Sequence, residues 1–208
     1  MVDPLANASI PMQLTEACMA EDIASAMRDL YNQNQLLVDQ VHPRGGWTDG
    51  VFANLNLMPV LYKFLSIQYD RLGQDPVLIR HAAYRAGAIL YLAAIRVKFA
   101  IDFSANLHVQ NLKDSLSVME GLNVDCDLPV LVWLLVVGGT RSITNQEHDW
   151  FVFKLAQVIA FMGCESWEQV MYHVRGVLWA DGVAQEECEV LRGEVSTKVW
   201  SSYSHAFA

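Results

Sequence analysis

The sequence carries little charge for its size, and it is especially poor in basic residues. Of its 208 residues only 18% are charged, with 14 Lys and Arg against 23 Asp and Glu, which gives a formal net charge of −9. Soluble domains carry about 25% charged residues on average. Because a protein that binds duplex DNA needs a basic face for the phosphates, we expect no direct contact with nucleic acid.

Closely spaced metal or redox ligands are also missing. The four cysteines, Cys18, Cys126, Cys164 and Cys188, are scattered, and no pair has the C-x-x-C spacing of zinc sites and redox dithiols. No H-E-x-x-H motif, Rossmann fingerprint, Walker loop or kinase signature occurs, so neither a metal nor a nucleotide cofactor is expected. The cysteines are therefore predicted to be buried free thiols in a reducing compartment.

No hydrophobic run is long enough to cross a membrane. The most apolar run, residues 128–137, is followed by two glycines and is much shorter than the ~20 residues that span a bilayer. Residues 1–12 lack the basic start and continuous apolar stretch of a signal peptide. We expect no membrane association and an intracellular location, cytoplasmic or nuclear.

What the chain does have is a high apolar content, 53%, arranged with helical periodicity. Disordered chains are poor in apolar residues, so disorder is excluded. Apolar residues recur every three or four positions and alternation with period two is rare, which predicts an all-α fold in a single domain over residues 1–208. The expected helices cover residues 14–41, 49–71 with an interruption near Pro59, 76–101, 105–120, 128–139, 145–162, 167–179 and 183–199.

Several of these helices have a recognisable start. Thr144 with Glu147, and Ser166 with Gln169, have the spacing of capping boxes. In a capping box the hydroxyl accepts from the third helical amide and the later side chain reaches back to the cap amide. The expected N-caps are Asp75, Asp127, Thr144, Ser166 and Asp181.

The helix predicted over residues 76–101 places polar side chains on an otherwise apolar face. Tyr84 lies three residues after His81, and Tyr91 lies seven residues after Tyr84, a step of three plus four. Tyr62 of the preceding helix is expected to join them. Two phenols and an imidazole can donate hydrogen bonds into a dry cavity and polarise a carbonyl group. We take His81, Tyr84 and Tyr91 as candidate catalytic residues. The alternative is that the tyrosines pack in the core with their hydroxyls at its rim.

Aromatic side chains supply a candidate lining for such a cavity. The segment RGGWTDGVF at residues 44–52 combines three glycines with Trp47 and Phe52. It is interpreted either as the mouth of a pocket, with both rings as apolar walls, or as a helix-connecting turn with Trp47 in the core. With Tyr62, Trp133 and Trp150, these two residues are the candidate substrate-binding side chains.

The C-terminal half resembles a known family. The segments that carry the resemblance are LPVLVWLLVVGG at 128–139, WF at 150–151, SWEQV at 166–170, VLWAD at 177–181 and ECEVLRGEV at 187–195. In this order they are similar to the helical regulatory domain, of the middle-homology type, of fungal zinc binuclear cluster transcription factors. The resemblance implies a helical shell that senses metabolites or contacts regulatory partners.

One departure from that family shapes the functional expectation. Residues 1–40 hold one cysteine, Cys18, and one basic residue, Arg28, whereas the family's DNA-binding head has six cysteines and a basic linker. We expect a regulatory shell without its DNA-binding head.

Two functions follow from these observations. The first is a cofactor-independent cyclase for an apolar terpenoid or polyketide intermediate, for example through an intramolecular Diels–Alder reaction, because holding the reacting ends together in a dry cavity is sufficient catalysis for it. The second is a non-enzymatic domain that senses a metabolite or binds a protein. The expected partners are an apolar small molecule and either a second copy of the chain or a regulatory protein.

Overall fold

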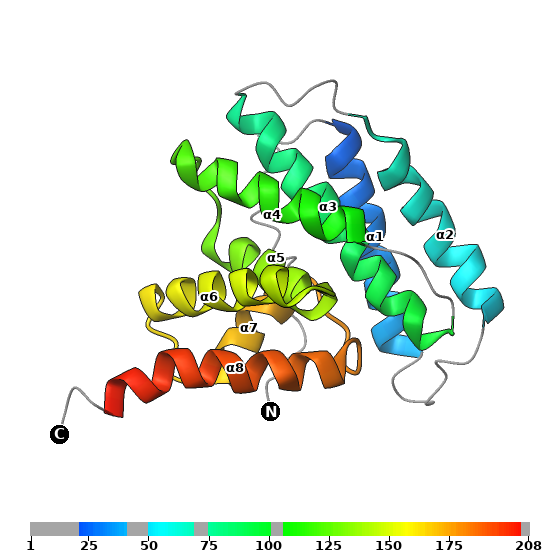
Figure 1. Ribbon diagram of the computed structural model, residues 1–208. Coiled ribbons are helices and arrows are strands. Elements are labelled where there is room, and N and C mark those ends of the chain that lie inside the picture. Colours follow the sequence, from blue (N-terminus) through cyan, green and yellow to red (C-terminus); the bar gives the residue numbers. More distant parts are fainter. Residues whose placement is uncertain (1–20, 41–49, 69–74, 101–105, 205–208) are drawn as a thin grey trace, which may run out of the picture.

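The computed structural model describes residues 21–40, 50–68, 75–100 and 106–204, except for the side chains of residues 40, 52, 53 and 200–204. Over these ranges the chain forms eight α-helices and no strand, which confirms the all-α prediction (Figure 1). The helices are α1 (Glu21–Gln40), α2 (Gly50–Ser66), α3 (Pro76–Lys98), α4 (Asn106–Gly121), α5 (Leu128–Arg141), α6 (Asn145–Phe161), α7 (Trp167–Val177) and α8 (Gln185–Ser204).

Two helices hold the others together. α3 packs against α1, α2, α4 and α5, and α5 packs against α3, α4, α6, α7 and α8. Figure 1 shows the result, with α1 and α2 beside α3 at one end of the molecule and α6 to α8 gathered around α5 at the other. Both central helices are almost entirely buried, which explains why their sequences are apolar on every side.

Close packing around α5 depends on its two glycines. A Cβ atom on Gly138 would overlap the ring of Phe151 in α6, and one on Gly139 would lie 3.0 Å from a methyl carbon of Leu191 in α8. Because these two residues have no side chain, α6 and α8 can approach the backbone of α5 at the end of its apolar run.

Helix termini agree with the sequence only in part. Asp75 caps α3, because its carboxylate accepts from the amide of Val77 at 2.9 Å. Thr144 accepts from the amide of Glu147 at 3.2 Å, so this N-cap is also confirmed. The reciprocal contact expected from Glu147 is wrong, because its carboxylate accepts from the Thr144 hydroxyl at 2.8 Å instead.

The second capping box shows a similar difference. Ser166 accepts from the amide of Gln169 at 3.4 Å, as expected for the N-cap of α7. The side chain of Gln169 accepts from the amide of Glu165 at 2.7 Å, one residue before the cap. The side chains of Glu147 and Gln169, at the third helical position, thus each hydrogen-bond to a group other than the amide of the N-cap residue.

Of the two remaining N-caps, Asp127 is confirmed in position only and Asp181 is wrong. Asp127 stands at the N-cap position of α5, but its side chain makes no capping hydrogen bond. Asp181 does not cap α8, which begins four residues later at Gln185, and its carboxylate pairs with Arg175 at 3.2 Å.

The interruption expected at Pro59 does not occur. α2 continues through this residue, and Pro59 lies on the exposed side of the helix. Proline deprives the carbonyl group four residues earlier of its helical donor. That carbonyl belongs to Leu55, which is itself exposed, so water can satisfy it.

The close approach to Gly138 generates a stability prediction. Gly138→Ala forces the added methyl group into the buried ring of Phe151, and we expect a loss of about 1 to 3 kcal/mol in the free energy of unfolding. Gly193→Ala is the matched control, because Gly193 lies in the middle of α8 with open space around the new methyl group. This control is expected to be neutral or stabilising by up to about 1 kcal/mol. Urea unfolding followed by circular dichroism measures both, and equal stability of the two variants would contradict the packing described for Gly138.

Candidate functional site

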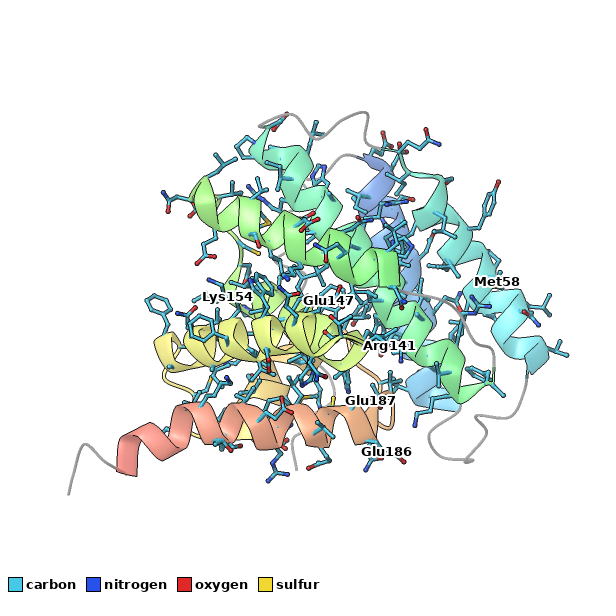
Figure 2. The ribbon with its side chains drawn as sticks, viewed as in Figure 1. Met58, Arg141, Glu147, Lys154, Glu186 and Glu187 are labelled. Atoms are coloured by element: carbon cyan, nitrogen blue, oxygen red, sulfur yellow. The ribbon has the colours of Figure 1, made fainter. Side chains whose placement is uncertain are left out.

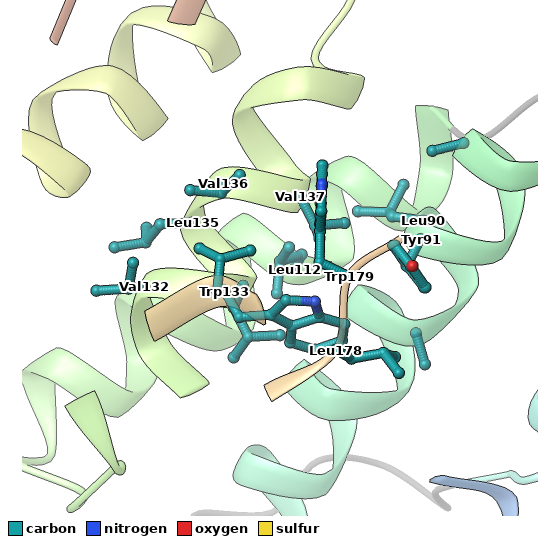
Figure 3. Packing of buried hydrophobic residues seen from close by; sticks show 14 of the residues in the cluster. Leu90, Tyr91, Leu112, Val132, Trp133, Leu135, Val136, Val137, Leu178 and Trp179 are labelled. Atoms are coloured by element: carbon teal, nitrogen blue, oxygen red, sulfur yellow. The ribbon is translucent and has the colours of Figure 1, made fainter. Parts of the chain in front are cut away.

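Tyr91, one of the candidate catalytic residues, lies in the centre of the molecule. α3 places its ring beside Trp133 and Trp179 (Figure 3), with ring centroids 6.3 Å and 5.6 Å away. The Tyr91 hydroxyl donates to Oδ1 of Asn34 at 2.5 Å and accepts from the amide of Ala180 at 2.8 Å. Its single proton is therefore already used, and in this geometry it has none to donate to a bound carbonyl group.

The partners of Tyr91 extend this interaction across three parts of the chain. Nδ2 of Asn34 donates to the carbonyl oxygen of Trp179 at 3.4 Å. Asn34 belongs to α1, Tyr91 to α3, and residues 179 and 180 to the connection between α7 and α8. The amide of Asn34 and the phenol of Tyr91 thus hold the ends of the molecule to each other.

Trp133 contributes to this core and not to a described cavity wall. Its side chain is fully buried, and the indole lies against the backbone of Gly87, where an added Cβ would be 3.2 Å from Cζ3 of the ring. Among the described residues its Nε1 atom has no hydrogen-bond partner. Trp133 is not in the lining of the cavity between α4, α5 and α6, and the substrate-binding role predicted for it stays a prediction.

The other two candidate catalytic residues are buried on the same helix. His81 and Tyr84 are almost inaccessible to solvent. Tyr84 hydrogen-bonds with the thiol of Cys126, and burial raises the pKa of the Tyr84 phenol far above its usual range. The phenol therefore stays protonated at any physiological pH, and Cys126 is its hydrogen-bond partner.

The remaining candidates do not join these three. Tyr62 is exposed on the outer side of α2, so the structure does not bring it to the face of α3 that carries Tyr84 and Tyr91. Trp47 and the side chain of Phe52 lie outside the described residues. The cavity expected around Trp47, Tyr84 and Tyr91 stays a prediction, because Trp47 lies outside the described residues.

A cavity does lie nearby, between α4, α5, α6 and the connection from α4 to α5. Its volume is about 300 Å³, at the lower end of the range for small-molecule sites. Trp150, one of the predicted substrate-binding residues, lines it together with Cys126, whose thiol contacts Tyr84. The other lining residues are Leu116, Met119, Glu120, Val124, Leu131, Leu135, Lys154, Gln157, Val158 and Phe161.

The polar groups of this cavity are few and mostly paired. Nζ of Lys154 in α6 lies 2.7 Å from each carboxylate oxygen of Glu120 in α4, and this ion pair bridges the two helices (Figure 2 labels Lys154). The Cys126 thiol donates weakly to the carbonyl oxygen of Asp127 at 3.6 Å. With the two charges neutralised by each other, the cavity suits an uncharged apolar molecule.

Two aromatic rings define its sides. Trp150 is half-buried and packs edge to face on Phe151, with ring centroids 4.9 Å apart. Phe161, at the end of α6, is largely exposed. One ring is held by the core and the other faces solvent, so the cavity is open toward the end of α6.

Sequence reasoning missed most of this lining. Leu131, Leu135 and Val158 have the helical spacing of ordinary core residues, and nothing in the sequence separates a cavity wall from a packed core. Glu120 and Lys154 are 34 positions apart, so only the tertiary fold shows that they meet.

His148 contributes to the architecture and lies away from the cavity lining. Its Nδ1 atom is 3.0 Å from the carbonyl oxygen of Gly139 and its Nε2 atom is 2.7 Å from a carboxylate oxygen of Glu194. The ring thereby links the start of α6 to the end of α5 and to α8.

The described residues form neither a metal cluster nor a membrane-spanning helix. Within the described ranges no group of three or more His, Cys, Asp or Glu side chains is arranged to hold a metal ion. No described helix is both long and apolar enough to cross a bilayer.

Comparison with known proteins adds no relative. The chain matches no protein-family model, no curated protein and no solved structure.

The hydrogen bonds of Tyr91 predict a structural effect for its hydroxyl. Tyr91→Phe leaves the amide of Ala180 and the side-chain oxygen of Asn34 without this partner in the core, so we expect a loss of about 2 kcal/mol in the free energy of unfolding. Tyr172→Phe is the control, because Tyr172 is exposed and its hydroxyl is expected to contribute less than about 0.5 kcal/mol. Chemical denaturation measures both. If Tyr91→Phe were as stable as the control, the central role of this hydroxyl would be wrong.

The buried thiols predict alkaline destabilisation. Burial raises the pKa of Cys126 to about 11 and that of Cys188 to about 12, from 9.0. Because the unfolded chain loses these protons first, stability is complete below pH 9 and falls as the pH rises toward 11 to 12. We expect the free energy of unfolding to drop by about 2 to 3 kcal/mol between pH 8 and pH 10. Urea titrations at the two pH values test this, and a Cys126→Ala/Cys188→Ala variant that fell just as steeply would contradict it.

Proposed function

We propose that this protein binds an uncharged, apolar small molecule in the cavity between α4, α5 and α6. The observation that carries the proposal is the cavity itself, about 300 Å³ in volume and lined mainly by apolar side chains. Its one ion pair, Lys154 with Glu120, is internally neutral. An anionic ligand gains little there, because it would have to displace Glu120 from Lys154 before pairing with it.

The use of this ligand is proposed to be conversion to a cyclic isomer. An intramolecular cycloaddition needs no proton transfer, and the enzyme contributes by holding the two reacting ends in contact. This suits a cavity whose polar groups are already paired. The cycloaddition balances within one molecule, because two new carbon–carbon bonds form at the expense of π bonds and no group leaves. A terpenoid or polyketide intermediate remains the proposed substrate class.

A sensing role without chemistry is the second candidate. It is favoured by the resemblance of residues 128–139 to the regulatory domain of fungal zinc cluster transcription factors. The landmark residues Trp133, Gly138 and Gly139 are packed in the core, so the resemblance bears on the scaffold and supports a binding role more directly than a catalytic one. In that reading the cavity holds an effector and α4 and α6 respond to it.

The binding proposal predicts a cavity-dependent interaction with a neutral apolar dye. Nile red is expected to bind with an increase in fluorescence and to be displaced by farnesol, a neutral sesquiterpenoid alcohol. Val158→Trp fills the cavity from α6 and is expected to weaken dye binding at least tenfold. Val190→Trp, an equal enlargement on the exposed side of α8, is the control and is expected to change nothing. Equal dye binding by both variants would place the binding elsewhere and defeat the proposal.

A second experiment, with the wild-type protein and the Val158→Trp variant, distinguishes the cyclase from the sensor. The probe is a 1,7,9-decatrien-3-one, which cyclises slowly without catalyst. It is incubated with the protein, the products are separated by chromatography, and their masses are measured by mass spectrometry. A bicyclic isomer of unchanged mass that forms faster than background, and less so with Val158→Trp, supports the cyclase. Saturable displacement of Nile red by the triene without acceleration supports the sensor.

A further inference from the structure

α2 carries a second apolar stripe that faces solvent. Its inner stripe, Leu57, Leu61 and Phe64, is buried against α1 and α3. On the outer side five large apolar residues are between 36% and 73% exposed. We call them the α2 stripe; they are Val51, Leu55, Met58, Tyr62 and Leu65.

The spacing within the α2 stripe is that of a helix-pairing seam. Successive members are separated by four, three, four and three residues, which is the a and d pattern of a coiled coil. A helix at the surface of a soluble protein normally presents one apolar stripe to the core and polar residues outside. α2 departs from this rule at the outer edge of the helix bundle, where Figure 1 shows it and Figure 2 labels Met58.

We propose that the α2 stripe is the interface through which two copies of this chain associate about a twofold axis. The first argument is symmetry. Met58 is the middle member, and Val51 and Leu65 lie seven residues to either side of it. In an antiparallel pair centred on Met58, Val51 of one copy meets Leu65 of the other. Leu55 is three residues before Met58 and Tyr62 four residues after it, so these two meet with an offset of one residue. A surface that closely matches its own reverse is what a twofold interface requires.

The second argument is charge. Two copies with a net charge of −9 each repel one another through most of their surfaces. α2 has a single charged side chain, Lys63, whose Nζ lies 2.6 Å from the carboxylate of Asp29 and 2.7 Å from the hydroxyl of Ser25 in α1. The α2 stripe thus presents neither a charge that repels a second copy nor one that attracts an acidic or basic partner. A lipid surface is disfavoured for the same reason, since helices that lie on membranes present Lys and Arg beside the apolar face.

The third argument is area. Five side chains of this size and exposure offer on the order of 500 Å² per copy, so a symmetric pair removes on the order of 1,000 Å² from water, about the minimum for a specific interface. A patch of about this size is the largest that a typical monomer exposes, and it is often functional. We therefore expect a reversible dimer with a dissociation constant in the micromolar range.

Sedimentation equilibrium of the full chain from 1 to 100 μM tests the proposal. The wild-type protein is expected to reach twice the monomer mass of 23.3 kDa as its concentration rises. Leu55→Glu/Tyr62→Glu is expected to weaken association at least tenfold. Tyr172→Glu/Val190→Glu carries the same change at two exposed positions on α7 and α8 and is expected to dimerise like the wild type. A wild-type protein that stays monomeric at 100 μM, or a stripe variant that dimerises normally, would overturn the proposal.

A cross-link tests the geometry and remains decisive if the double variant fails to fold. Met58→Cys places a thiol next to its own copy at the twofold axis, so mild oxidation is expected to give a disulfide-linked dimer. Val190→Cys, on α8, is expected to give none. Circular dichroism confirms that both variants fold. Dimers that form in solution without the Met58→Cys cross-link would show a different interface and overturn the arrangement.

Discussion

The hydroxyl group of Tyr91 is the contact on which the arrangement of this protein depends most directly. It donates to Asn34 in α1 and accepts from Ala180 between α7 and α8, which joins segments 57 and 89 residues away in sequence. The Tyr91 side chain is fully buried, so a hydrogen bond lost at its hydroxyl leaves buried polar partners unsatisfied. Apolar packing brings the helices together without strongly specifying their register, whereas this hydrogen-bonded centre has one geometry in which all its partners are satisfied.

This role gives the hydroxyl of Tyr91 a structural use beside the catalytic one predicted from the sequence. A tyrosine on an apolar helix face has the same sequence signature whether its hydroxyl points into a substrate cavity or toward a backbone amide. At Tyr91 the amide of Ala180 and the oxygen of Asn34 are both present, so the hydroxyl serves the fold. The cavity instead formed where α4 and α6 diverge over α5, a place where the chain supplies Trp150, Cys126 and a self-neutralised ion pair.

The cavity and the α2 stripe divide the apolar surplus of the sequence between two proposed uses. An apolar content of 53% with 18% charged residues is more apolar and less charged than the average soluble domain. Part of the surplus lines the space beneath Trp150 and Phe161, and part lies on the outer side of α2. The first is concave and sized for a small molecule, while the second is a straight helical stripe sized for another helix. The two surfaces are both apolar, and it is their different shapes that lead us to propose a small molecule for the cavity and a second helix for the α2 stripe.

The sequence by itself determined the helices, because their signals are local. Periodic apolar residues and the caps at Asp75, Thr144 and Ser166 act within a few residues of each terminus. The all-α class and the burial of the face bearing His81, Tyr84 and Tyr91 followed from the same periodicity. Of the candidate binding residues whose side chains the structure describes, Trp150 is the one that lines the cavity.

Only the tertiary structure decided which apolar faces are packed, hollow or exposed. α7 shows this most clearly, since the sequence predicted a helix to residue 179 and the structure ends it at Val177. Leu178 is extended, which delivers the backbone of Trp179 and Ala180 to Asn34 and Tyr91. The local preference for another helical turn is a fraction of a kcal/mol per residue, whereas satisfying two buried polar groups contributes about 1 to 3 kcal/mol each. The distant partners therefore prevail, and no local pattern announces them.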